Sequence, residues 1–162
     1  MTTVWISGPR AVGKSTVAWE VYRRLVTTTK AGYLDVAQLT FATPPLDLPA
    51  TARRLHAVRR VYLEEGAHHL VITGEHHPDL LPDANLCWLH ATHDDLVTRL
   101  LLRGAGQGPA IPGDDLRGLP DEHLRHLANP TPPPPEAHLV LDTTAQTATN
   151  LATTIINHFF TT

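Results

Sequence analysis

Short apolar runs alternate along the chain with longer stretches in which apolar residues recur every three or four positions. The runs cover residues 3–7, 33–36, 69–73, 86–90 and 138–141. Nearly continuous apolar runs of this length indicate strands that are buried on both faces. The stretches with helical spacing cover residues 17–26, 51–65, 92–103 and 151–159. Alternating strands and helices of this kind predict an α/β domain, with a parallel sheet between two layers of helices.

Residues 104–135, called the lid segment below, interrupt this alternation. Glycine and proline recur through its first half, and Pro132 to Pro135 form a stiff, extended stretch. Only Asp121 to Leu127 has the pattern of a short helix. We therefore expect a long, irregular connection between the fourth and the fifth strand.

The composition limits the classes of protein to which the chain can belong. Its 162 residues fit one domain, and its single cysteine excludes an intramolecular disulfide. The formal charge of −3 argues against broad electrostatic binding to nucleic acid. No apolar run approaches the ~20 residues that span a bilayer, and the first residues lack the pattern of an export signal. We expect a cytoplasmic protein, monomeric or homodimeric, with no nucleic-acid or membrane partner.

The segment Gly8-Pro-Arg-Ala-Val-Gly13-Lys14-Ser15, called the phosphate loop below, matches the pattern G-x-x-x-x-G-K-[ST] in full. A predicted strand precedes it and a predicted helix follows, which is the context that such a loop requires. Glycines let backbone amides approach phosphate oxygens, and the helix N-terminus adds a partial positive charge. We expect Lys14 to reach the β- and γ-phosphates of ATP or another nucleoside triphosphate, and the Ser15 hydroxyl to bind Mg²⁺. The other residues expected at the nucleotide are Gly8, Arg10, Ala11, Val12, Gly13 and Thr16.

In this motif, and in the order of its predicted strands and helices, the chain resembles the P-loop kinases of small molecules. These include adenylylsulfate, gluconate and shikimate kinases, chloramphenicol phosphotransferase and the nucleoside monophosphate kinases. The resemblance implies a three-layer P-loop NTPase fold, with a five-stranded parallel sheet in the order 2-3-1-4-5, for the single domain 1–162. It also implies that the lid segment is mobile. The implied activity is ATP- and Mg²⁺-dependent transfer of the γ-phosphoryl group to a hydroxyl of a small molecule.

The same resemblance assigns roles to residues outside the phosphate loop. Asp35 corresponds to the carboxylate at the end of the second strand and would hold, or deprotonate, the acceptor; the alternative is that it caps the next loop or helix. Arg99 and Arg103, on the helix that leads into the lid segment, would contact phosphates or the base. The alternative for both is a surface ion-pair ladder with Asp95, since the three residues are four positions apart. Thr143, after the last strand, would line the adenine pocket.

Residues at the acceptor are less clearly defined by the resemblance. Glu75 and His76 follow the third strand, where we expect substrate contacts. This strand lacks the usual aspartate that supports Mg²⁺, and Glu75 or Asp79 would replace it. Either Arg53 or its neighbour Arg54, at the expected start of a helix, would meet an anionic group of the substrate; the alternative is that both belong to a solvated face of that helix. Arg117 and Arg125 are further candidates for closing the lid segment.

Two other functions stay open at this point. A nucleoside monophosphate kinase would need an arginine-lined acceptor site, and a regulatory protein would bind nucleotide without catalysis. The histidine pairs 68–69 and 76–77 predict no shared metal site, because the strand between them separates them by roughly 25 Å. Core packing is the expected role of the remaining residues singled out, Cys87, Trp5, Trp19 and Trp88.

Overall fold

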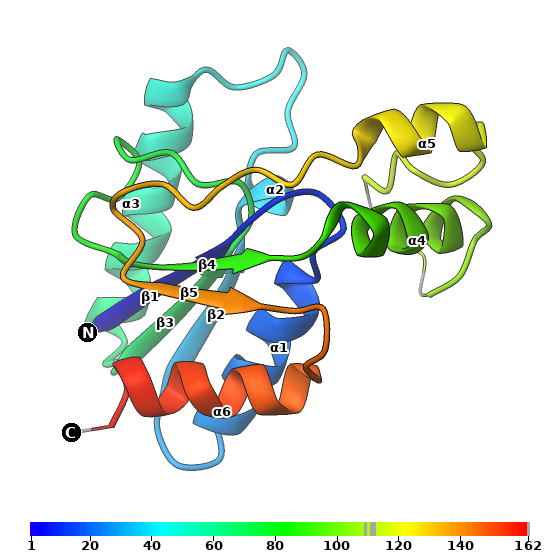
Figure 1. Cartoon of the computed structure of the whole chain (residues 1–162). Coiled ribbons are helices and arrows are strands. Elements are labelled where there is room, and N and C mark those ends of the chain that lie inside the picture. Colours follow the sequence, from blue (N-terminus) through cyan, green and yellow to red (C-terminus); the bar gives the residue numbers. More distant parts are fainter. Residues whose placement is uncertain (109, 111–112, 162) are drawn as a thin grey trace.

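A computed structural model describes residues 1–108, 110 and 113–161 of the chain. Its centre is a five-stranded parallel sheet with the order β2-β3-β1-β4-β5, which confirms the predicted fold class and strand order (Figure 1). The strands are β1 (Thr2–Ser7), β2 (Ala31–Asp35), β3 (His69–Thr73), β4 (Asn85–His90) and β5 (Leu139–Asp142). Since all five run in the same direction, their carboxyl ends meet at one edge of the sheet.

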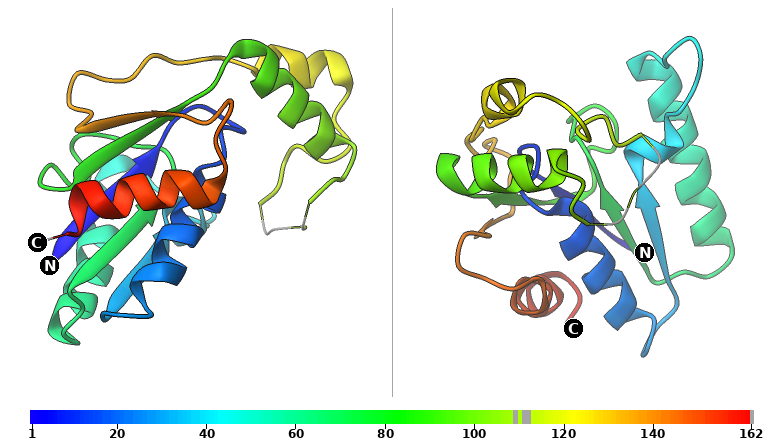
Figure 2. Two further views of the ribbon diagram at one scale, coloured as in Figure 1. Left: turned by 60° about the horizontal axis from the view of Figure 1, so that its bottom comes forward. Right: turned by 90° about the vertical axis from the view of Figure 1, so that its right-hand side faces the viewer.

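Helices cover both faces of this sheet and extend beyond one end of it. The helices are α1 (Lys14–Leu25), α2 (Val36–Leu39), α3 (Leu48–Glu64), α4 (His93–Gly104), α5 (Asp121–Leu127) and α6 (Ala148–Phe159). Helices α1 and α6 lie side by side on one face, and α3 covers the other (Figure 2). Helices α4 and α5 pack on each other past the carboxyl end of β4.

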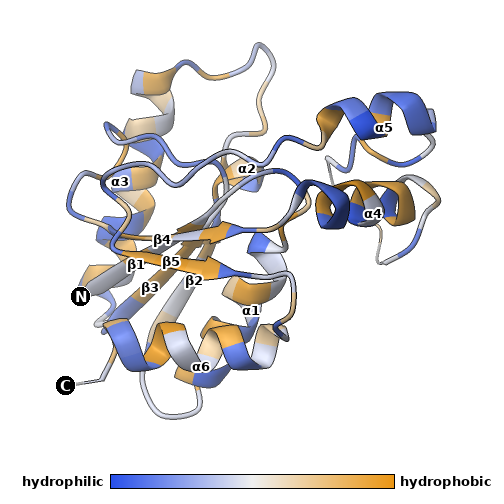
Figure 3. Ribbon diagram, viewed as in Figure 1, coloured by the Kyte–Doolittle hydropathy of each residue, from blue (hydrophilic) through white to orange (hydrophobic). Residues whose placement is uncertain are grey.

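The alternating direction of side chains along each strand builds a separate core on each face. Ile6 and Leu89 belong to the cluster under α1 and α6, whereas Trp5 and Ile72 belong to the cluster under α3. Figure 3 shows that the hydrophobic colour is concentrated on the strands and on the inner faces of the helices. The predicted core positions of Cys87, Trp5 and Trp88 are confirmed by their burial.

The prediction of a core position for Trp19 is wrong. Trp19 is 52% exposed, and its ring packs in a tilted arrangement against Tyr22 and edge-on against Tyr33. Its neighbours Val17, Ala18 and Val21 already fill the buried face of α1. Trp19 therefore lies on the outer side of the helix, where its ring extends the aromatic surface beside β2.

Two element boundaries differ from the expected ones because of side-chain caps. Asp47 accepts a hydrogen bond from the Ala50 amide, so that α3 begins at Leu48, before the expected residue 51. Asp35 caps the four-residue helix α2, which the sequence pattern did not predict. Thr92 caps α4, since its hydroxyl accepts from the amide of Asp95.

The lid segment leaves α4, forms α5 and returns along the α3 side of β4 to β5 (Figure 1). Leu124 of α5 is buried, and a Cβ added to Gly104 would lie 2.3 Å from its Cδ1 atom. The return is fixed by a hydrogen bond from the His138 amide to the Leu86 carbonyl (2.9 Å). Residues 109, 111 and 112 of the lid segment lie outside the described residues. Among the described residues, we find no helix with the length and apolar content needed to cross a membrane.

Candidate functional site

A cavity of about 660 Å³ lies at the carboxyl edge of the sheet. Its wall combines the phosphate loop, the ends of β2, β3 and β4, and part of the lid segment. Ligands of parallel α/β sheets bind at this edge, outside the carboxyl ends of the strands. The cavity thus brings most of the residues singled out in the sequence to one place.

The phosphate loop takes its shape from positions that tolerate little substitution. Gly8 has a φ of 148°, and a Cβ there would lie 2.2 Å from the Leu89 carbonyl oxygen. Gly13 and Ala11 also have positive φ, at 99° and 62°. The loop leads directly into α1, which begins at Lys14, so that unpaired amides of the first helical turn face the cavity. This is the geometry of an anion site at a helix N-terminus.

Not all of the phosphate loop lines the cavity. The loop residues that do so are Gly8, Pro9, Arg10, Gly13, Lys14 and Ser15, and Thr16 of α1 lines the cavity next to them. Ala11 and Val12 do not, and the Val12 side chain is buried in the core. These two residues lie on the side of the loop that faces away from the cavity.

Lys14 is folded back onto its own loop. Its Nζ atom donates to the carbonyl oxygens of Gly8 (2.9 Å) and Pro9 (2.8 Å). Burial lowers the pKa of Lys14 to about 8; the Glu75 and Asp35 carboxylates oppose this change, and Arg10 adds to it. The ammonium group is therefore held inside the cavity with little compensation for its lost hydration.

Asp35 caps α2 and also lies at the cavity, and its role toward an acceptor stays a prediction. Its Oδ1 atom accepts from the amides of Ala37 (2.9 Å) and Gln38 (3.4 Å), which confirms the capping interpretation. The residue also lines the cavity. Within the described chain, its Oδ2 atom has no hydrogen-bond partner. One oxygen is thus used by α2, and the other remains able to receive a ligand.

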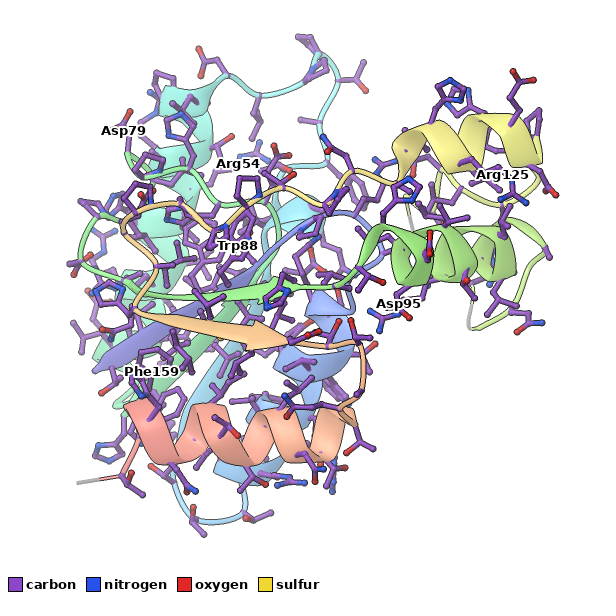
Figure 4. The ribbon with its side chains drawn as sticks, viewed as in Figure 1. Arg54, Asp79, Trp88, Asp95, Arg125 and Phe159 are labelled. Atoms are coloured by element: carbon purple, nitrogen blue, oxygen red, sulfur yellow. The ribbon has the colours of Figure 1, made fainter. Side chains whose placement is uncertain are left out.

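The end of β3 contributes Glu75 and His76 to the cavity, whereas Asp79 is not part of its lining. The Asp79 side chain is 78% exposed, with Oδ2 3.7 Å from the Nδ1 atom of His77 (Figure 4). The His76 ring is 9% exposed, and its Nδ1 atom lies 4.0 Å from the Glu136 carboxylate. Burial lowers the pKa of His76, partly opposed by Glu136, so the ring is neutral at neutral pH. Glu75 is thus the better placed of the two carboxylates considered for the metal.

Two aspartates of the lid segment also line the cavity, and sequence reasoning missed both. The Asp114 carboxylate accepts from Arg103 (Nη2, 2.9 Å) and from Arg117 (Nε, 3.1 Å). Asp115 pairs with Arg10 of the phosphate loop at 3.2 Å. Partial burial raises the pKa of Asp114, but hydrogen bonds from Arg103, the Leu116 amide and Arg117 lower it by more. The lid segment is therefore connected by ion pairs to both the phosphate loop and α4.

Arg99 and Thr143 lie together, but outside the cavity lining. Arg99 donates to the Val12 carbonyl (3.1 Å), to the Thr143 hydroxyl (2.8 Å) and to the Thr143 carbonyl (2.8 Å). The alternative of an ion-pair ladder is wrong, because Asp95 bonds to Thr92 and Arg103 to Asp114. Arg99 joins α4, the phosphate loop and the end of β5; contact of either residue with a nucleotide stays a prediction.

The remaining arginine candidates do not reach the cavity. Arg53 lies over a separate hollow along α3, beside His56 and Leu63. Arg54 donates to the Leu39 carbonyl (3.4 Å). Figure 4 places Arg125 on α5, where it is far from the sheet.

Two lining residues, Trp88 and Phe41, have a chemical character that the sequence did not flag. The Trp88 side chain is 9% exposed, and its Nε1 donor is buried without a hydrogen-bond partner in the described chain. Phe41 is exposed over the cavity and touches Gly113 of the lid segment. Trp88 lies between β4 and the returning lid segment (Figure 4). Trp88 and Phe41 thus add aromatic surface to the lining of the cavity.

Oxygen donors for Mg²⁺ are present in the cavity. The Ser15 hydroxyl and the Glu75 carboxylate both line it, and such oxygens are the ligands that Mg²⁺ prefers. The described residues contain no group of three or more His, Cys, Asp or Glu side chains able to hold a metal by themselves. This donor set fits an ion that is shared with substrate phosphates.

The solved structures that share this fold include kinases. The shikimate kinase from Acinetobacter baumannii, in complex with shikimate, matches at 17% identity with a TM-score of 0.53, covering 98% of this chain and 92% of that one. The APS kinase from Mycobacterium tuberculosis, in complex with AMPPNP and APS, matches at 20% identity with a TM-score of 0.57, covering 96% and 95%. The shikimate kinase from Bacteroides thetaiotaomicron matches at 14% identity with a TM-score of 0.56, covering 97% of each chain. No protein-family model and no curated protein sequence matches the chain. At these identities, the expected resemblance is confirmed at the level of the fold.

Proposed function

We propose that this protein is an ATP- and Mg²⁺-dependent kinase that transfers the γ-phosphoryl group to a hydroxyl of a small molecule. One observation carries the proposal: a complete phosphate loop and a carboxylate with a free oxygen, Asp35, line the same cavity. The kinase neighbours, one with a nucleotide analogue bound, add support from the fold. Phosphoryl transfer requires positioning and charge neutralisation more than covalent chemistry, and the cavity offers groups for both.

The proposed roles follow from the positions of the side chains. The loop amides and Lys14 bind the β- and γ-phosphates, and Lys14 leaves the carbonyls of Gly8 and Pro9 to do so. The Ser15 hydroxyl would hold Mg²⁺, and the bound ion would neutralise charge on the phosphates. Arg103 reaches the transferring group from α4 when Asp114 releases it. Arg99 and Thr143 border the base, beyond the cavity.

The reaction is a displacement at the γ-phosphorus. Asp35 orients the acceptor hydroxyl through its free Oδ2 atom and receives the hydroxyl proton. The acceptor oxygen bonds to the γ-phosphorus as the bond to the β–γ bridging oxygen breaks, and ADP leaves. We place the entire reaction in the single domain 1–162, with the lid segment closing over it.

The two alternative functions have less support. A nucleoside monophosphate kinase needs arginines at the acceptor, and neither Arg53 nor Arg54 lines the cavity. A non-catalytic regulatory protein would not need the free Asp35 oxygen in the phosphate cavity, although it would bind ATP equally well.

The test measures binding and transfer separately. Calorimetry with MgATP should show binding, and Lys14→Ala should weaken it by about a hundredfold. With a mixture of hydroxyl metabolites and ATP, mass spectrometry should detect a phosphorylated product. Asp35→Asn should lower kcat by about a hundredfold or more and leave ATP affinity unchanged. ATP binding without product from any acceptor would assign the protein to the regulatory class, and absence of ATP binding would refute both functions.

A further inference from the structure

The charged side chains that line the cavity are divided between two sides. The cations Arg10, Lys14 and Arg103 all lie on the side of the phosphate loop and α4. Arg10 is paired with Asp115, and Arg103 with Asp114. Lys14 is the one cation in the lining that bonds only to backbone carbonyls. The cationic groups are thus gathered where the nucleotide phosphates bind.

The opposite side carries negative charge without a counter-ion. Asp35 and Glu75 line it, and neither forms a salt bridge within the described chain. His76 beside them is neutral at neutral pH. The nearest arginine of α3, Arg54, is bonded to the Leu39 carbonyl. Both carboxylates attract the Lys14 ammonium group electrostatically. Once nucleotide phosphates surround this ammonium group, the phosphates compensate its charge in place of the two carboxylates.

This division determines which acceptor can bind beside a nucleotide. A carboxylate or phosphate on the acceptor would meet Asp35 and Glu75, with no cation of the described lining on that side. An ammonium group would instead meet a carboxylate in a partly enclosed cavity, where the attraction is stronger than in bulk water. The charges therefore select against anionic acceptors and in favour of cationic ones.

The uncharged part of the lining fits a compact acceptor that also carries hydroxyls. The Trp88 side chain also lines the cavity and offers apolar surface to the carbon atoms of such an acceptor. The exposed ring of Phe41 offers an apolar face, and aromatic faces attract ammonium groups. The side-chain amide of Gln38 adds a further polar group to the same wall.

We propose that the acceptor is a hydroxyl compound with an ammonium group, an amino alcohol or amino sugar, whose ammonium binds Glu75 while its reacting hydroxyl lies at Asp35. This inference rests on the proposed kinase function, which it makes specific. It also distinguishes this chain from its structural neighbours in complex with shikimate or APS, both of which are anionic compounds.

The test uses acceptors that are matched in size and differ in charge. Glucosamine, glucose and gluconate form one set, and 2-aminoethanol, ethylene glycol and glycolate form another. Each compound, and a library with equal numbers of cationic, neutral and anionic alcohols, is incubated with saturating MgATP at neutral pH. Phosphorylated products are then measured by mass spectrometry. We expect kcat/KM for the ammonium compound to exceed that for its carboxylate partner by about tenfold or more.

Each outcome separates the inference from the function on which it rests. A preferred acceptor that is neutral or anionic overturns the inference and leaves the kinase function in place. Absence of product from every compound, with ATP bound, contradicts the kinase function itself. A preferred cationic acceptor supports both.

Substitution of Glu75 tests the residue assignment. Glu75→Gln should raise KM for the preferred ammonium acceptor by about tenfold, while the Mg²⁺ concentration needed for half-maximal rate stays unchanged. Asp79→Asn is the matched control: it removes the same charge from the same connection, outside the cavity, and should leave KM unchanged. An increased Mg²⁺ requirement in Glu75→Gln, with an unaltered acceptor KM, would assign Glu75 to the metal and overturn its proposed role.

Discussion

At the scale of single residues, the environment of Lys14 in the free protein favours the binding of a phosphate group. Its ammonium group is partly dehydrated and bonds only to two loop carbonyls, and its pKa falls to about 8. In the unfolded chain the same group titrates near its ordinary value of 10.5. A phosphate beside Lys14 favours the charged form and raises the pKa again.

Nucleotide binding should therefore take up a proton at alkaline pH. Above about pH 8, Lys14 of the free protein is increasingly neutral, and bound phosphate restores its charge, so that ATP affinity should fall as the pH rises. This proton uptake can be measured by calorimetry in two buffers that differ in ionisation enthalpy. A suitable pH is 8.5, which is ~0.5 unit above that pKa. Lys14→Met should abolish the uptake, and an uptake that persists in the variant would assign the proton to another group.

Residues also show where sequence reasoning reached its limit. The phosphate loop and Asp35 could be located because each follows directly from a local pattern. Arg53 was placed at a helix start, but the Asp47 cap begins α3 at Leu48, which moves Arg53 to the second turn. Asp114 could not be found, because its arginine partners meet it only after the lid segment has turned back toward α4.

At the scale of elements, the attachment of α5 to α4 fixes the lid segment. Leu124 is the buried residue of α5, and it packs against Gly104 at the end of α4. Leu124→Ala should destabilise the protein by about 2–4 kcal/mol and increase hydrogen exchange in α5. Leu102→Ala, at a position of α4 that is 44% exposed, is the control and should have a small effect. Equal destabilisation by both variants would show that α5 does not depend on this contact.

The Asp114 cluster is the second attachment of the lid segment, and it should make stability depend on acidic pH. The pKa of Asp114 lies below its ordinary 3.8, so that the unfolded chain binds its proton first as the pH falls. The stabilisation is thus present above pH 3.8 and is lost as the pH falls through the folded-state value.

Asp114→Asn should reveal this contribution. At neutral pH, we expect a melting temperature lower by about 2–6 °C, because Arg103 and Arg117 lose their shared acceptor. The difference from the unmodified protein should shrink as the pH is lowered below about 4 in thermal denaturation experiments. A difference that stays constant with pH would mean that the stabilisation does not come from the ionised Asp114 carboxylate.

At the scale of the whole molecule, the lid segment touches both sides of the cavity. Asp115 pairs with Arg10 of the phosphate loop, and Gly113 contacts Phe41, beyond α2. The Arg10–Asp115 pair is largely exposed, at 46% and 65%, so it contributes little stability by itself. Phosphates bound in the loop would compete with Asp115 for Arg10 and give the lid segment a different set of contacts.

MgAMPPNP should consequently change the protection of the lid segment from proteases. We expect slower cleavage within residues 104–135 when the nucleotide is bound, and no change in the Lys14→Ala variant at the same concentration. The measurement is limited proteolysis with mass-spectrometric mapping of the cut sites. Equal cleavage rates with and without nucleotide would contradict closure.

The fold as a whole could be predicted because several features of the sequence indicate it independently. Each strand is a compact apolar run, and the phosphate loop marks the first turn. The strand order followed from the resemblance and is confirmed by the sheet. The composition of the cavity was less predictable, since Trp88, Phe41 and Asp115 come from segments far apart in the chain. Their meeting depends on the return path of the lid segment, which glycine and proline content alone does not specify.

The position of Trp88 has a photophysical consequence. The chain has three tryptophans, of which Trp5 is fully buried, Trp19 is exposed beside Tyr33, and Trp88 lines the cavity. Indole emission responds to the polarity of the surroundings, and Trp88 is the indole that lines the cavity. The protein thus carries an intrinsic fluorophore that reports, without a label, when a molecule enters beside Asp35.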